Sequence, residues 1–182
     1  LRADIYKDPK TVYFGRILQN MNIIVINDVN PREVNYEVDE DGNWKDEYRH
    51  PLGLRIFGMT RPTMAVDLAG NLYIGESFIL KEIYEKFPNN YEAADVVKAV
   101  LLHESMHISE MTFYRQQDRH PRIWNIATDA FINYTLIQNG YTLPNGIVPD
   151  KNGILTVNVM LPSGAIQVQY SLAGKSAEMI YD

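Results

Sequence analysis

One five-residue segment carries the strongest chemical signal in this sequence. His103-Glu104-Ser105-Met106-His107 forms the pattern HExxH. On a helix, two histidines four residues apart share one face with their Cβ atoms about 6 Å apart, so both imidazoles can bind one ion. Glu104 follows the first histidine and lies beside the metal, where it can take a proton from a bound water. The segment therefore predicts hydrolysis by a metal-activated water.

A metal site of this kind needs further protein ligands. The chain contains no cysteine, so histidine, aspartate and glutamate are the side chains that can hold the ion. A catalytic zinc usually has three protein ligands and one open position. The candidates for the third ligand follow the motif in the sequence: Glu110, Asp118, His120 and Asp129.

Asp129 is the favoured third ligand. It lies in the middle of a predicted helix, and its neighbours Ile126, Ala127, Ala130 and Ile132 are apolar. A carboxylate in such surroundings is expected to be buried, and a buried carboxylate needs a cation or hydrogen-bond donors. Glu110 remains the main alternative, because it lies one turn beyond His107 and close to the same face.

Four further residues are predicted to orient the metal ligands or to bind the substrate. Asn125 and Asn133 flank Asp129 at i−4 and i+4, where they can orient ligands through hydrogen bonds. Glu110 and Tyr134 are assigned to the same group of ligand-orienting or substrate-binding residues. Tyr134 is one of several side chains that could donate to a developing oxyanion.

Two helices must position these residues. The first is predicted over Tyr91–Arg115, with Asn90 as N-cap and an apolar middle, Val96–Leu102, that indicates burial. The second is predicted over Pro121–Gln138, because proline suits a first helical turn and Asn139-Gly140 is a typical stop.

The remaining elements are shorter. Ile23–Ile26, at the end of a predicted helix over Lys7–Ile26, is equally good strand material. Asn27–His50 is polar and is predicted to form a long irregular connection. The other expected elements are strands over Met64–Asp67 and Leu72–Ile74, a helix over Glu76–Lys86, a hairpin of Ile154–Leu161 with Ala165–Tyr170, and a helix that begins at Ser176.

Composition limits the class of protein. With 182 residues, 46% hydrophobic and 22% charged, the sequence is typical of one globular domain over residues 1–182. A net charge of −6 argues against a nucleic-acid partner, and the short apolar runs predict no membrane span. No signal peptide is recognised, so we expect a cytoplasmic location. The first residue is Leu1 and the last residues begin a helix, which suggests a fragment of a longer protein.

The motif and its surroundings resemble a known family. Val100–His107, Arg119, the run Trp124–Asn133 and the segments Leu143–Gly146 and Ser176–Tyr181 are similar to zincin-like metallopeptidase domains found N-terminal to a von Willebrand factor A-like domain. Pro62–Asp67 also resembles the strand before the active helix of that family. Members often carry another histidine near the positions of Met111 and Thr112, which is missing here and shifts weight to Asp129.

The resemblance implies a fold and a mechanism. The fold is α+β and zincin-like, with a small mixed sheet packed on an active-site helix that carries HExxH and a second ligand-bearing helix. One Zn²⁺ is bound by His103, His107 and Asp129, and Glu104 is the catalytic base. Residues 27–58 form an insertion or variable segment. A von Willebrand factor A-like domain and an ATPase are the implied partners.

Three functions are consistent with these residues. The first is a zinc-dependent metallopeptidase, an endopeptidase that cleaves a peptide or protein substrate. The second is a catalytically silent binding or assembly module with a zincin-like fold and a structural metal. The third is a metal hydrolase that cleaves another kind of bond, because HExxH does not by itself define the bond that is broken.

Overall fold

The computed structural model describes residues 12–26, 64–144, 148–161 and 164–182. The fold is α+β, as predicted. The chain divides into two compact units, Gln19–Ala93 and a second unit of Leu1–Leu18 with Ala94–Asp182. The predicted variable segment 27–58 lies outside the described residues, and the single domain over 1–182 stays a prediction.

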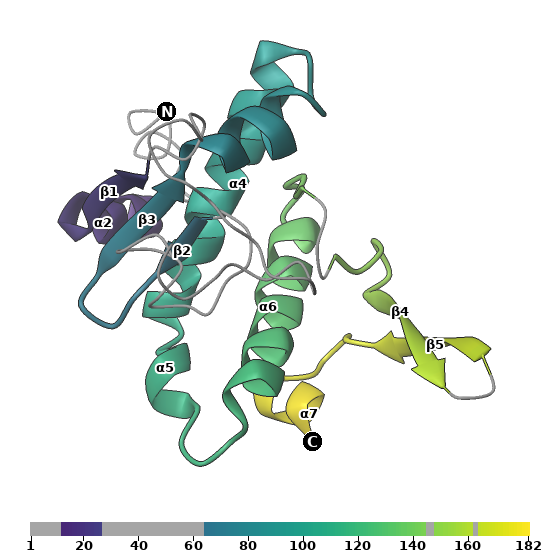
Figure 1. Ribbon diagram of the computed structural model, residues 1–182. Helices are drawn as coiled ribbons and strands as arrows, with labels where there is room; N and C mark the ends of the chain where they lie inside the picture. The colour runs from purple at the N-terminus through teal and green to yellow at the C-terminus, as the bar shows by residue number, and fades with distance from the viewer. Residues whose placement is uncertain (1–11, 27–63, 145–147, 162–163) are drawn as a thin grey trace, which may run out of the picture. The chain divides into compact units, whose positions relative to one another are not determined.

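The first unit contains a three-stranded sheet. Its strands β1 (Asn22–Ile26), β3 (Asn71–Gly75) and β2 (Met64–Val66) lie side by side in that order (Figure 1). β1 is parallel to β3 and β2 is antiparallel to it, so the sheet is mixed, as predicted.

The helix predicted over Lys7–Ile26 is wrong at its C-terminal end. Helix α2 spans Val12–Asn20, and Ile23–Ile26 belongs to β1. The three β-branched isoleucines and one valine of this stretch favour the extended backbone, and pairing with β3 satisfies it. Residues 7–11 lie outside the described part of the chain.

The turn between β2 and β3 is organised by one carboxylate. Asp67 accepts hydrogen bonds from the backbone N–H groups of Ala69 and Asn71, each at 2.9 Å, and from the Tyr73 hydroxyl at 3.0 Å. After the turn and β3, the helix predicted over Glu76–Lys86 is present. Its central part, η2 (Phe78–Tyr84), has π-helical hydrogen bonding.

The second unit contains the helices that carry the motif residues. Helix α4 spans Asn90–Ser109, and the Asn89 side chain, one residue before the predicted cap, accepts from the Tyr91 N–H at 3.0 Å. The single helix predicted to Arg115 is interrupted, because Met111 has a left-handed backbone (φ 52°) and a short helix α5 (Thr112–Arg115) follows. Helix α6 spans Pro121–Gln138, the predicted bounds.

The C-terminal part of this unit is a hairpin and a short helix. Strands β4 (Ile154–Leu161) and β5 (Gly164–Ser171) pair antiparallel, and helix α7 (Ala177–Tyr181) begins at Ser176, whose side chain accepts from the Met179 N–H. Ala130, Leu155 and Leu172 form a buried cluster against which Tyr134, Tyr170 and Ile180 pack. None of the helices in the described ranges is long and apolar enough to cross a membrane.

Gly153, which precedes β4, is the position at which this packing is tightest. Its φ is +77°, and a Cβ added there would lie 2.7 Å from Cε2 of the Tyr134 ring. Gly174 has a similar φ of +72°, but a Cβ added there meets nothing within 4 Å. Substitution of Gly174 therefore tests backbone strain alone, whereas substitution of Gly153 adds a steric clash.

We expect Gly174→Ala to lower the free energy of unfolding by about 1 kcal/mol, through the left-handed backbone alone. Gly153→Ala should lower it by at least about 1 kcal/mol more, because the methyl group displaces the Tyr134 ring from the cluster. Urea unfolding of both variants and of the wild type measures the difference. Equal losses would show that Tyr134 does not pack on Gly153 as described.

Candidate metal centre

Three side chains from two helices converge on one point. His103 and His107 project from the same face of α4, and Asp129 projects from α6. The two Nε2 atoms are 3.0 Å apart, and Asp129 Oδ1 lies 3.1 Å from Nε2 of His107 and 3.5 Å from Nε2 of His103. Within the described ranges, these three residues form the group of His, Cys, Asp and Glu side chains that can hold a metal ion.

The spacing of these atoms fits a tetrahedral ion. Zinc ligands lie about 2.0–2.1 Å from the metal, which places any two ligand atoms of a tetrahedral site roughly 3.3 Å apart. The three observed separations, 3.0, 3.1 and 3.5 Å, bracket that value. The three ligands found in the described part of the chain leave a fourth corner of the tetrahedron, the position that catalytic zinc sites keep for water or substrate.

Each of the three candidate ligands also contacts an uncharged side chain, through the polar atom that does not face the other two ligands. Nδ1 of His103 lies 2.8 Å from Oδ1 of Asn133, and Nδ1 of His107 lies 3.2 Å from Oγ1 of Thr112. The amide of Asn125 donates to Oδ2 of Asp129 at 3.0 Å, which leaves Oδ1 directed toward the histidines. Asn133 thus contacts His103 and Asn125 contacts Asp129, and their predicted role in orienting ligands stays a prediction. Thr112 was not among the predicted site residues.

The metal-free cluster already carries opposite charges. Burial opposes protonation of His103, but the hydrogen bond to Asp129 and the charges of Glu104 and Asp129 outweigh it and raise the pKa of His103 to about 9. Burial likewise opposes ionisation of Asp129, but hydrogen bonds from both histidines lower its pKa to about 2. At neutral pH a metal ion therefore has to displace the His103 proton, so metal binding should strengthen as the pH rises toward 9.

Glu104 is buried beside this cluster. Only 6% of its surface is exposed, and its charge acts on the neighbouring His103 ring. A carboxylate is rarely buried to this extent without a partner that stabilises its charge. Glu104 directly follows His103 on α4, the position that the HExxH pattern gives to its glutamate.

The other predicted residues lie elsewhere. Glu110 faces Arg115, with 3.3 Å between its carboxylate and the guanidinium, and is not part of the metal group. Asp118 and His120 are exposed in the connection before α6 and are also outside that group. Tyr134, a partly buried residue of α6, packs on the cluster of Ala130, Leu155 and Leu172.

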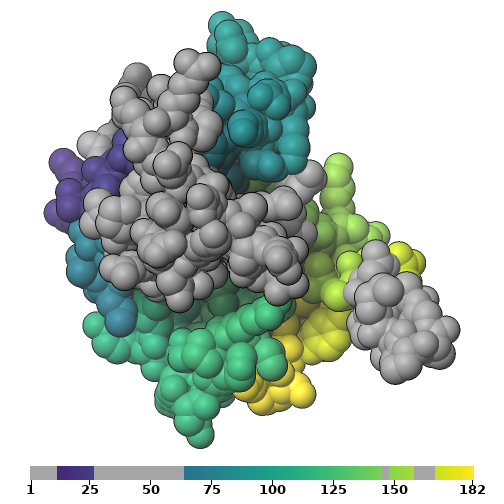
Figure 2. Space-filling view, in the orientation of Figure 1, coloured from purple at the N-terminus to yellow at the C-terminus, as the bar shows by residue number. Residues whose placement is uncertain are grey.

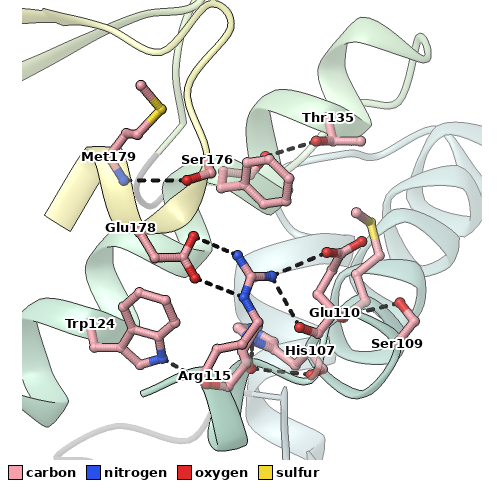
Figure 3. A network of polar contacts seen from close by, with 12 residues as sticks. His107, Ser109, Glu110, Arg115, Trp124, Thr135, Ser176, Glu178 and Met179 are labelled. Atoms are coloured by element: carbon pink, nitrogen blue, oxygen red, sulfur yellow. Dashed lines mark hydrogen bonds and ion pairs between the residues drawn. The ribbon is translucent and has the colours of Figure 1, made fainter. Parts of the chain in front are cut away.

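An arginine links α7 to the region that follows His107. Arg115 binds both carboxylate oxygens of Glu178, at 2.9 and 2.8 Å, and donates to the backbone carbonyl of Glu110 at 3.1 Å (Figure 3). The His120 N–H donates to the hydroxyl of Tyr181 at 3.0 Å. In the space-filling view, the yellow surface of α7 accordingly lies against the green surface of the segment that contains α5 (Figure 2).

Comparison with known families gives one match. Residues 86–182, just over half of the chain, match the family model described as "Putative metallopeptidase domain". The chain belongs to this family. The matched range contains the three candidate metal ligands, Glu104 and Thr112. Comparisons with curated proteins and with solved structures gave no match.

Membership of this family confirms the resemblance that the sequence indicated around His103–His107 and Trp124–Asn133. The von Willebrand factor A-like companion domain and the ATPase partner stay predictions.

We expect the wild-type chain to bind about one Zn²⁺. His103→Ala and Asp129→Ala should each weaken zinc binding more than about 100-fold, because loss of an outer hydrogen-bond partner alone costs about 10–100-fold. Glu110→Ala is the matched control, since its carboxylate faces Arg115, and it should retain the ion. Competition with a chromophoric chelator measures the affinities. Zinc retained by Asp129→Ala but lost from Glu110→Ala would move the third ligand to Glu110.

The Arg115–Glu178 pair predicts a specific pH dependence. The hydrogen bonds from Arg115 lower the pKa of Glu178 from 4.5 to about 2 in the folded protein. Since the folded pKa is the lower one, the pair stabilises the fold above pH 4.5, and this contribution is lost as the pH falls toward 2. Each partner is about 30% exposed, so solvent screening limits the contribution to about 1 kcal/mol.

Glu178→Gln should therefore reduce the free energy of unfolding by about 1 kcal/mol at pH 7, and the deficit should shrink below pH 4.5. Urea unfolding of both proteins between pH 7 and pH 3 measures it. Glu92→Gln, an exposed glutamate on α4, serves as the control for a change in net charge. A deficit that is constant over this pH range would contradict the ion pair.

Proposed function

We propose that this chain is a zinc-dependent metallopeptidase with Glu104 as its general base. The observation that carries the proposal is the convergence of two Nε2 atoms and one carboxylate oxygen within 3.0–3.5 Å of one another, beside the buried Glu104. Membership of the metallopeptidase family supports the same assignment.

The donor set favours zinc over other common ions. Two imidazole nitrogens and one carboxylate oxygen suit Zn²⁺, whereas Mg²⁺ and Ca²⁺ prefer sites built from oxygen ligands. Copper or iron could occupy similar donors, so the identity of the ion rests on geometry as well. The separations of the three ligand atoms match a tetrahedral site, which is the usual geometry of zinc.

The chain supplies the proton transfers. A bound zinc would polarise the scissile carbonyl and lower the pKa of a water to near 7. Glu104 accepts a proton from the attacking water and then delivers it to the leaving amine, so that the carboxylate is restored after each cycle. Asn133 and Asn125 hold His103 and Asp129 in place during these steps.

A structural metal is the alternative that the geometry disfavours. A closed structural site has four protein ligands, whereas the group in the described part of the chain has three. We therefore place hydrolysis first and propose a peptide or protein as the substrate.

Glu104→Gln should retain zinc and lower peptide hydrolysis by about 10²–10⁴-fold, because the amide cannot accept the proton of the attacking water. Glu92→Gln is the matched control on the same helix and should hydrolyse as well as the wild type. Release of fluorescence from quenched casein, at equal zinc content, measures the rates.

Two outcomes would contradict this proposal. Casein hydrolysis by Glu104→Gln at the wild-type rate would exclude Glu104 as the base. A zinc-loaded wild type that hydrolyses nitrophenyl esters through Glu104 but cleaves neither casein nor a peptide library would point to a metal hydrolase that acts on another bond.

A further inference from the structure

We propose that Thr112 is a positioning residue that fixes the tautomer and ring orientation of His107. The inference rests on the metal site proposed above, and it assigns a role to a residue that the HExxH motif does not include. His107 is 93% buried, so its ring nitrogens depend on protein groups for their hydrogen bonds.

The hydrogen-bond geometry determines which nitrogen of His107 carries the proton. Oγ1 of Thr112 lies 3.2 Å from the backbone oxygen of His107 and 3.2 Å from its Nδ1. A hydroxyl has one proton, and a carbonyl oxygen can only accept. The Thr112 proton therefore goes to the carbonyl, and its oxygen accepts from Nδ1–H. This assigns Nε2, the nitrogen that faces Asp129 and His103, as the metal-binding atom; a bound ion would replace the hydrogen bond that Nε2 donates to Asp129.

The backbone explains why a residue five positions later reaches the ring. In a continuous helix, residues i and i+5 do not share a face. After α4 ends at Ser109, the left-handed Met111 turns the chain so that α5 begins with Thr112, whose Oγ1 lies 3.2 Å from Nδ1 of His107. The break therefore positions the Thr112 hydroxyl as well as ending the helix.

Thr112 is itself held from the other side. The indole N–H of Trp124 donates to the Thr112 carbonyl at 2.8 Å, and Trp124 is 3% exposed. The guanidinium of Arg119 lies 5.0 Å from the Trp124 ring, and Arg115 donates to the carbonyl of Glu110, just before the break. These contacts fix the threonine through its backbone and leave its hydroxyl to act on His107.

The test compares three variants of comparable size. Thr112→Val removes the hydroxyl at nearly constant volume, and Thr112→Ser retains it. Thr135→Val is the control, because the Thr135 hydroxyl donates to the backbone of Phe131 and not to a metal ligand. Thr112→Ala carries the same prediction as Thr112→Val if the valine variant does not fold. Circular dichroism confirms folding of each variant.

Two measurements decide the role of Thr112. Thr112→Val should bind Zn²⁺ about 10–100-fold more weakly than the wild type, whereas Thr112→Ser and Thr135→Val stay within about threefold of it. Nitrogen-15 NMR of the histidine rings should show a protected Nδ1–H on His107 in the wild type and in Thr112→Ser. In Thr112→Val, that proton should exchange with water or lose its downfield shift.

The outcomes separate this inference from the proposed function. Equal zinc affinity and an unchanged Nδ1–H signal in Thr112→Val would overturn the role of Thr112 and leave the metallopeptidase intact. A wild type that binds no zinc would overturn the proposed function. The Nδ1–H signal in the metal-free protein would then decide the role of Thr112 alone, and loss of that signal in Thr112→Val would support it.

Discussion

The constraint on which the site depends is the close approach of three polar atoms inside the protein. Two Nε2 atoms and one carboxylate oxygen lie within 3.0–3.5 Å of one another. These polar groups lose their hydration on burial. They are stable together only if a positive charge balances the carboxylate and if their other polar atoms form hydrogen bonds. In the absence of metal, a proton on His103 provides the balance against Asp129. A divalent cation provides it more fully, because it interacts with all three ligand atoms at once.

The helices make this approach possible through different relations. His103 and His107 are brought together by the helical repeat alone, so any continuous helix would do the same. Asp129 reaches the two histidines only if α6 lies beside α4 in one register. The hydrogen bond between His103 and Asn133, which lies one turn after Asp129 on α6, fixes that register. Thr112 instead reaches the His107 ring through a break in the helix. The left-handed backbone of Met111 turns the chain so that the fifth residue after His107 contacts that ring. Regular and irregular backbone are both required.

The sequence was most informative where a periodic pattern and a chemical motif coincide. Helical spacing alone relates His103 to His107, and Asn125 and Asn133 to Asp129. The bounds of α6 followed from its first proline and the Asn139-Gly140 stop, and Asp129 was favoured because a carboxylate among apolar neighbours needs a cation or hydrogen-bond donors. The end of α4 could not be predicted, since methionine is not a residue that marks a left-handed turn, and Thr112 was therefore missed. The helix predicted over Lys7–Ile26 ran into β1, although Ile23–Ile26 was recognised as strand material, because the partner strand β3 lies far away in the sequence. Long-range pairing has no local signature.

The choice of outer partners has consequences for the chemistry. In many metal sites a histidine ligand donates to a carboxylate, which raises its basicity and weakens the pull of the ion on its water. The partners described here for His103, His107 and Asp129 are an amide, a hydroxyl and an amide. A divalent ion bound by these ligands would keep a net charge of about +1. In the proposed function, that charge would stabilise the buried carboxylate of Glu104, because hydrolysis at neutral pH requires a base that is ionised next to the attacking water.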